Sequence, residues 1–142
     1  HLDGKVVSWT TRSISDDFHR ERYINAKPSE ELVKAKSILF GIDHCRHAVI
    51  VTEGPFDTFR IGPGAVATMG LAYTKAQLRK ISEFPVRVIA FDSEPIAQKR
   101  ARNLCSELEA FPGETHNITL KAKDPGSASE REIAKLRKTF LE

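Results

Sequence analysis

One apolar run, residues 48–54 (AVIVTEG), constrains the fold of this chain more than any other feature. Short runs of β-branched and small apolar residues that end in Gly-Pro are typical of strands buried on both faces. Such strands occur in parallel sheets, whose ligands bind outside the carboxyl ends of the strands. A second run, residues 86–91 (VRVIAF), is also followed by acids, Asp92 and Glu94. Glu53 and these two acids are therefore expected at the mouth of a site.

Strands and helices alternate from residue 48 onward, which predicts an α/β fold: a mostly parallel sheet flanked by helices. Short strands are expected over 65–68 and 115–120. Helices are expected over 55–61, with Phe56, Phe59 and Ile61 as its apolar residues, and over 74–82, 95–110 and 129–140. Thr74 with Gln77 forms a capping box, and Ser129 with Glu132 is expected to cap the last helix.

The segment before residue 48 carries weaker signals. Residues 4–9 (GKVVSW) have a short strand pattern, and 10–27 read as a polar loop with several basic residues. Pro28, followed by Glu30 and Glu31, predicts a helix that begins there and ends near Gly41.

Composition sets broad limits on function. The chain is 40% hydrophobic and 29% charged, like an ordinary globular protein, and its net charge of +3 permits nucleic-acid binding without requiring it. Two cysteines without zinc-ligand spacing predict reduced thiols and a cytoplasmic location. No apolar run approaches the roughly 20 residues of a membrane span, so no membrane partner is expected. Because the chain begins without methionine, it is expected to be a piece of a longer protein.

Acidic residues follow three of the expected strands: Glu53, the pair Asp92 and Glu94, and Asp124. In a parallel sheet these positions lie along one edge. Carboxylates that converge without His or Cys are the ligands of a hard cation such as Mg²⁺ or Mn²⁺. Each acid alone also has a structural explanation, since Asp92 could cap the next helix and Asp124 lies in a turn sequence. Their joint placement favours the metal site.

Four motifs in order then resemble a known family: EGPFD (53–57), ATMG (67–70), FDSE (91–94) and KDPG (123–126). They are similar to the successive motifs of a TOPRIM domain, a Rossmann-like fold, in the catalytic core of bacterial and phage DnaG-type DNA primases. Upstream, GKVVSWTTR (4–12) and RYIN (22–25) resemble the small basic subdomain that precedes TOPRIM in those primases. The resemblance implies part of that subdomain over 1–46, TOPRIM over 47–127 and a C-terminal helix over 128–142.

The resemblance implies synthesis of short RNA primers from nucleoside triphosphates on single-stranded DNA, by nucleotidyl transfer with Mg²⁺ or Mn²⁺. By position, it assigns catalysis to Glu53, Asp92 and Glu94. It assigns metal binding to these three with Asp57 and Asp124, and nucleotide or template binding to Arg12, Arg22, Tyr23 and Asn25. A replicative helicase, within a primosome, is the expected protein partner.

The chain departs from the family pattern at four positions. Glu94 replaces the second aspartate of Asp-x-Asp, Gly126 replaces an acid, Ala97 replaces a glycine and Arg22 replaces a lysine. The missing acid at Gly126 leaves the number of metal ions open. Two alternatives therefore stay open: a TOPRIM-type metal-dependent nuclease, which leaves RYIN unexplained, and a degenerate, non-catalytic nucleic-acid-binding module of a primase-helicase.

Overall fold

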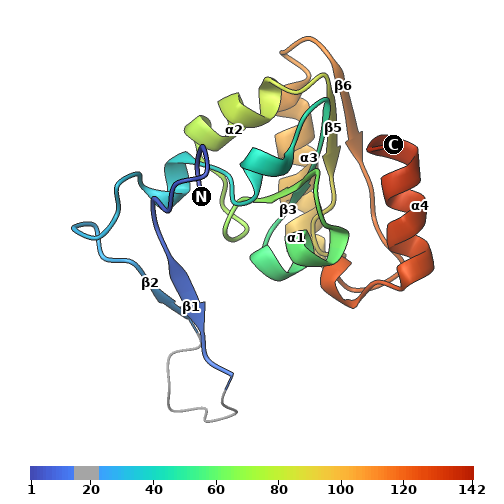
Figure 1. Ribbon diagram of the computed structural model, residues 1–142. Helices are drawn as coiled ribbons and strands as arrows, with labels where there is room; N and C mark the ends of the chain where they lie inside the picture. Colours follow the sequence, from blue (N-terminus) through green and yellow to red (C-terminus); the bar gives the residue numbers. More distant parts are fainter. Residues whose placement is uncertain (15–22) are drawn as a thin grey trace.

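A single parallel sheet forms the centre of the fold in a computed structural model that describes residues 1–14 and 23–142 (Figure 1). Its four strands are all parallel and lie in the order β4-β3-β5-β6. Their bounds are β3 (Ala48–Thr52), β4 (Ala65–Ala67), β5 (Val86–Ile89) and β6 (Glu114–Asn117). The predicted α/β fold with a parallel sheet is confirmed, and the strand at 48–52 is buried along its whole length.

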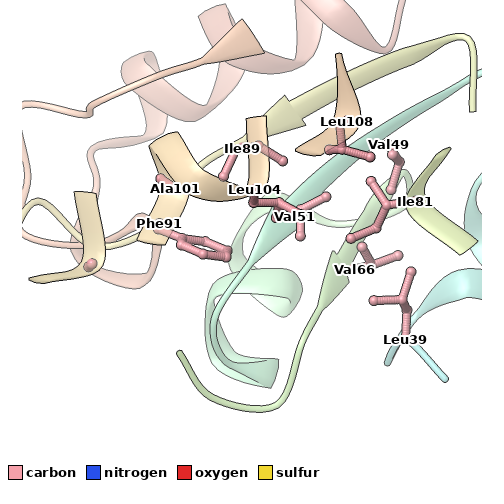
Figure 2. Packing of buried hydrophobic residues seen from close by; sticks show 11 residues of the cluster. Leu39, Val49, Val51, Val66, Ile81, Ile89, Phe91, Ala101, Leu104 and Leu108 are labelled. Carbon is pink, nitrogen blue, oxygen red and sulfur yellow. The ribbon is translucent and has the colours of Figure 1, made fainter. Parts of the chain in front are cut away.

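Helices cover both faces of this sheet: α1 (Pro55–Ile61), α2 (Lys75–Ser82), α3 (Pro95–Leu108) and α4 (Glu130–Phe140). Successive residues of a strand point to opposite faces. Val49 and Val51 of β3 therefore pack with Leu104 of α3 and Ile81 of α2 (Figure 2). Ile50 packs on the other face with residues of α1 and α4.

The helix starts follow the capping signals of the sequence. Thr74 accepts the N–H of Gln77 at 3.2 Å, and the Gln77 side chain accepts the N–H of Thr74 at 3.1 Å. Ser129 accepts the N–H of Glu132 at the start of α4. Both capping predictions are confirmed. Among the described residues, no helix combines the length and the apolar character that crossing a membrane requires.

The predicted strand over 4–9 is wrong. Val7 is buried and Val6 exposed, as in a strand, but the carbonyl of Val7 accepts the N–H groups of Leu32 and Val33 instead of those of a neighbouring strand. The predicted loop over 10–27 instead contains a short antiparallel hairpin, β1 (Thr10–Arg12) and β2 (Tyr23–Asn25), that extends away from the parallel sheet (Figure 1).

The predicted helix from Pro28 to Gly41 is also wrong, because the segment forms turns and one short 3₁₀ helix, η1 (Ala35–Ser37), and a second 3₁₀ helix, η2 (Ile42–His44), follows it. Glu31 fixes one turn, since its carboxylate accepts the Ala35 N–H at 3.0 Å and the Ser8 hydroxyl at 2.8 Å. Phe40 then exchanges two backbone hydrogen bonds with Ala67 at the edge strand β4. Backbone hydrogen bonds to the sheet thus replace those that a helix would form within the segment.

Candidate metal and nucleotide site

Glu53 and Asp92 meet at the carboxyl edge of the sheet, where the adjacent strands β3 and β5 end. The Asp92 N–H donates to Glu53 Oε1 at 3.1 Å. The Glu53 side chain is half-buried, and this burial raises its pKa to about 7, with smaller contributions from the negative charges of Asp92, Asp57 and Glu94. The hydrogen bond from Asp92 opposes the rise. A half-buried carboxyl group among other acids is stabilised either by taking up a proton or by a cation that binds next to it.

Asp92 is perturbed in the same direction. Burial raises its pKa to about 6, and the charges of Asp57, Asp124 and Glu94 add to the rise. Its backbone carbonyl accepts the side-chain amide of Gln98 at 2.9 Å, which fixes the chain beyond β5. The N-cap of α3 is Glu94, without a side-chain capping bond, so the structural explanation of Asp92 as a helix cap is wrong.

Asp57 lies in the first turn of α1 and joins this helix to the turn that contains Gly126. Its Oδ2 accepts the Gly54 N–H at 3.2 Å, and its Oδ1 accepts the Gly126 N–H at 2.9 Å. Burial raises the pKa of Asp57, and the charge of Asp124 raises it further. Asp124 in turn caps the 3₁₀ helix η3 (Pro125–Ser127), because its Oδ1 accepts the Ser127 N–H at 2.7 Å. Both acids thus have structural partners.

Glu94 is exposed, and its Oε1 pairs with Lys123 Nζ at 3.2 Å. The same two loops are joined by the backbone, since the Ser93 N–H donates to the Lys123 carbonyl at 2.7 Å. Sequence reasoning assigned no role to Lys123, although it stands in the KDPG motif next to Asp124. Its contact with Glu94 depends on the spatial meeting of two loops, which no local pattern reveals.

The predicted acids lie at one edge of the sheet. Burial is the main cause of the raised pKa values of Glu53, Asp57 and Asp92, and the negative charges of neighbouring acids raise these values further. Their donor chemistry, carboxylate oxygen only, fits Mg²⁺ or Mn²⁺. Within residues 1–14 and 23–142, however, no three His, Cys, Asp or Glu side chains already form a group that could hold an ion. Backbone N–H groups and Lys123 occupy several carboxylate oxygens instead.

The predicted nucleotide-binding residues Arg12, Tyr23 and Asn25 lie together on the β1–β2 hairpin. Arg12 stands opposite Tyr23, and Thr10 stands opposite Asn25 and donates its hydroxyl to Asn25 Oδ1 at 2.8 Å. All three predicted residues are exposed. Arg22 falls outside the described residues.

Phe56 connects this hairpin to the acids. The Arg12 guanidinium lies 4.7 Å from the centre of the Phe56 ring and 5.6 Å from that of Tyr23. Phe56 directly precedes Asp57 on α1. The hairpin and the acids at the edge of the sheet are therefore neighbours, which no local pattern in the sequence shows because Arg12 and Phe56 lie far apart along the chain.

No protein-family model and no curated protein matches the sequence. Solved structures do match. The zinc-binding and RNA polymerase domains of the Aquifex aeolicus primase are 24% identical over 95% of this chain and 36% of that chain, with a TM-score of 0.78. A structure of the DnaG catalytic core is 16% identical over 97% of this chain and 49% of that chain, with a TM-score of 0.75. This chain thus spans half or less of each matched structure. At these identities the similarity establishes the fold, and it confirms the resemblance first seen in the motifs: the chain has the fold of a DnaG-type primase catalytic core.

Proposed function

We propose that this chain acts in a DNA primase as its catalytic core, joining nucleoside triphosphates into short RNA primers on single-stranded DNA. The observation that carries the proposal is the convergence of Glu53, Asp57, Asp92, Glu94 and Asp124 at the carboxyl edge of a sheet with the primase fold. One matched structure is described as containing RNA polymerase domains, and the other as a catalytic core.

Glu53, Asp92 and Glu94 are the residues that would hold a divalent cation, Mg²⁺ or Mn²⁺. The ion would neutralise triphosphate charge and polarise the reacting phosphorus. Burial and mutual repulsion make the ionised forms of Glu53 and Asp92 unfavourable without a positive partner, which supports this assignment. Glu94 would exchange its contact with Lys123 for the ion, and this exchange would free the Lys123 ammonium to meet a phosphate.

Asp57 and Asp124 were predicted as metal ligands, and we propose that they mainly position the loops around the ion. Asp57 holds the Gly126 N–H, and Asp124 holds the Ser127 N–H. The turn at 124–127 is thereby fixed beside α1, and Lys123 stands at its entrance. This arrangement also suits a chain with Gly126 in place of an acid, because the backbone N–H of Gly126 has a partner in Asp57.

The triphosphate or the template strand would bind at Arg12, Tyr23 and Asn25. A guanidinium pairs with phosphate oxygens in forked geometry, and a tyrosine ring stacks on a base or sugar. Arg22 joins this set by its place in the sequence alone. A cytoplasmic location and a replicative helicase as partner stay predictions.

The deciding experiment is primer synthesis by the protein with Mg²⁺ or Mn²⁺, single-stranded DNA and nucleoside triphosphates. Asp92→Asn is expected to lower the rate by about 10²–10³-fold, because loss of a cation's stabilisation amounts to several kcal/mol. Glu83→Gln, at an exposed acid after α2, is the matched control and is expected to leave the rate unchanged. Equal rates for the wild type and Asp92→Asn would contradict the proposal.

A second candidate, the non-catalytic nucleic-acid-binding module, is favoured by one observation: no group of three ligating side chains is preformed among the described residues. Calorimetric titration with Mn²⁺ separates the two candidates. An absence of Mn²⁺ binding together with retained affinity for single-stranded DNA would favour the module. Cleavage of nucleic acid without triphosphates in the same reactions would indicate the nuclease instead.

A further inference from the structure

Two phenylalanines of α1 face solvent instead of the core. The helix buries Thr58 and Ile61, while Phe56 and Phe59 are 51% and 67% exposed. Residues three apart lie on one side of a helix, so the two rings share the outer side. Exposed aromatic surface of this extent, gathered in one place, is typical of a binding surface.

Phe40 extends these two rings into a contiguous row. Its ring meets that of Phe59 edge to face with centres 5.5 Å apart, and Phe59 meets Phe56 in the same way at 6.2 Å. We call Phe40, Phe59 and Phe56 the aromatic row. Phe40 is anchored by its two backbone bonds to Ala67, so the row stands on the sheet and on α1.

A hollow of about 630 Å³ adjoins the row. Phe40 and Phe59 line it, and Thr58 and Pro63 lie among its other lining residues. Asp43 is the one carboxylate in its lining, and both of its oxygens accept backbone N–H groups, those of Asp3 and Gly4. The hollow is thus mainly apolar, and its single acidic group already has partners.

The Phe56 end of the row carries a positive charge. The Arg12 guanidinium lies over the Phe56 ring, and no carboxylate among the described residues forms an ion pair with it. A guanidinium that stacks on a ring keeps its N–H groups free at the edges of its plane. Asp57, the neighbour of Phe56 in sequence, directs its oxygens to the N–H groups of Gly54 and Gly126 instead.

We infer that the aromatic row is a stacking platform for the bases of single-stranded nucleic acid, with Arg12 bound to a phosphate of the same strand. Proteins that bind single strands combine exposed aromatic rings with cationic groups in this way, because every base has a face on which a ring can stack. The inference rests on the proposed function, for which it names the path of the template: past Arg12 and along α1, beside the acidic edge. An unstacked base fits the hollow next to Phe59.

The test uses Phe59→Leu and Phe56→Leu, which keep an exposed apolar side chain and remove only the ring. Affinity for a fluorescein-labelled oligothymidylate, measured by anisotropy, is expected to fall about fivefold or more in each variant. An oligonucleotide of the same length with abasic sites is expected to bind the variants and the wild type equally. Phe111→Leu, ahead of β6 at the opposite end of the strands, is the matched control and is expected to bind as the wild type does.

Unchanged oligothymidylate affinity in both variants would overturn the inference, as would equal losses for the intact and the abasic oligonucleotide. Self-association that Phe59→Leu abolishes without a change in oligonucleotide affinity would overturn it as well, and would assign the row to a second copy of the chain. Failure of the proposed function would give a different result. Oligonucleotide binding would still depend on the phenylalanine rings, but no Asp92-dependent primer synthesis would be found.

Discussion

The parallel sheet and the β1–β2 hairpin carry the two halves of the proposed site, and they are held in different ways. Every residue of β3 is buried, whereas every residue of β2 is exposed. The sheet fixes the positions of Glu53 and Asp92, because Glu53 directly follows β3 and Asp92 follows β5 after the buried residues Ala90 and Phe91. Arg12 and Tyr23 depend on a pairing of three residues on each strand and on the contact of Arg12 with Phe56. The acidic half is therefore anchored to a buried sheet, whereas the basic half lies on an exposed hairpin, and we expect ligand binding to order the basic half more than the acidic half.

Truncation of one isoleucine in each region gives the largest contrast. Ile89→Ala in β5 is expected to lower the free energy of unfolding by about 2–5 kcal/mol, because Ile89 is 0% exposed in the core. Ile24→Ala in β2 is expected to change it by about 0.5 kcal/mol or less, because Ile24 is 53% exposed. Urea unfolding of both variants measures the difference. Similar losses would show that the hairpin is as strongly packed as the sheet.

Gln77 tests how the N-terminal segment is attached to the sheet. Its buried side-chain amide donates to the carbonyls of Ile38 and Thr68 at 2.9 and 3.0 Å. Gln77→Ala leaves both carbonyls without this partner, and it is expected to lower the free energy of unfolding by about 1–3 kcal/mol. Faster amide hydrogen exchange at Phe40 and Ala67 should accompany the loss. Gln98→Ala, which removes a similar bond at α3, should leave exchange at these two residues unchanged.

The difference between the sheet and the hairpin also explains which parts of the fold could be predicted from the sequence. The buried strands β3 and β5 and the capped helices were predictable because their signals are local: apolar runs, and caps such as Thr74 with Gln77. The edge shared by the acids follows from the parallel order of those strands. The hairpin was missed because three-residue strands are too short to show alternation.

The helix predicted from Pro28 to Gly41 is wrong because the residues that indicated it serve contacts with distant parts of the chain. Glu31 looked like an acid in the first turn of a helix, but its carboxylate binds Ser8, 23 residues away. Gly41 looked like a helix end, but it has a positive φ and lies so close to Ala65 that a Cβ would stand 2.8 Å from the Ala65 carbonyl oxygen. In the site, the contacts of Lys123 with Glu94 and of Gly126 with Asp57 have the same non-local origin.

The pH dependence of stability tests the acidic half alone. The folded state holds protons on Glu53 and Asp92 more tightly than the unfolded chain does, because burial raises both pKa values, to about 7 and about 6. In the range from about 4.5 to 7 the folded state thus binds more protons, and the free energy of unfolding falls as pH rises.

Glu53→Gln should flatten this dependence, because glutamine does not ionise. Mn²⁺ at pH 7 should stabilise the wild type more than Glu53→Gln, since an ion that binds only the folded state adds to its stability. Thermal unfolding between pH 4.5 and 7.5, with and without Mn²⁺, provides both comparisons. An unchanged slope in Glu53→Gln would show that Glu53 is more hydrated than its position indicates.

The smallest expected effect tests the basic half. Arg12→Gln removes one cation from the hairpin, so the slope of log affinity against log salt for single-stranded DNA should decrease by about 0.7, the value for one phosphate contact. Arg12→Lys keeps the charge and should restore the slope. It loses the planar group that stacks on Phe56 and Tyr23, and its affinity at any one salt concentration should therefore stay below that of the wild type. If Arg12→Lys restores affinity and slope together, charge alone explains the role of Arg12. If neither variant changes the slope, Arg12 makes no phosphate contact, and the template follows another path past the acidic edge.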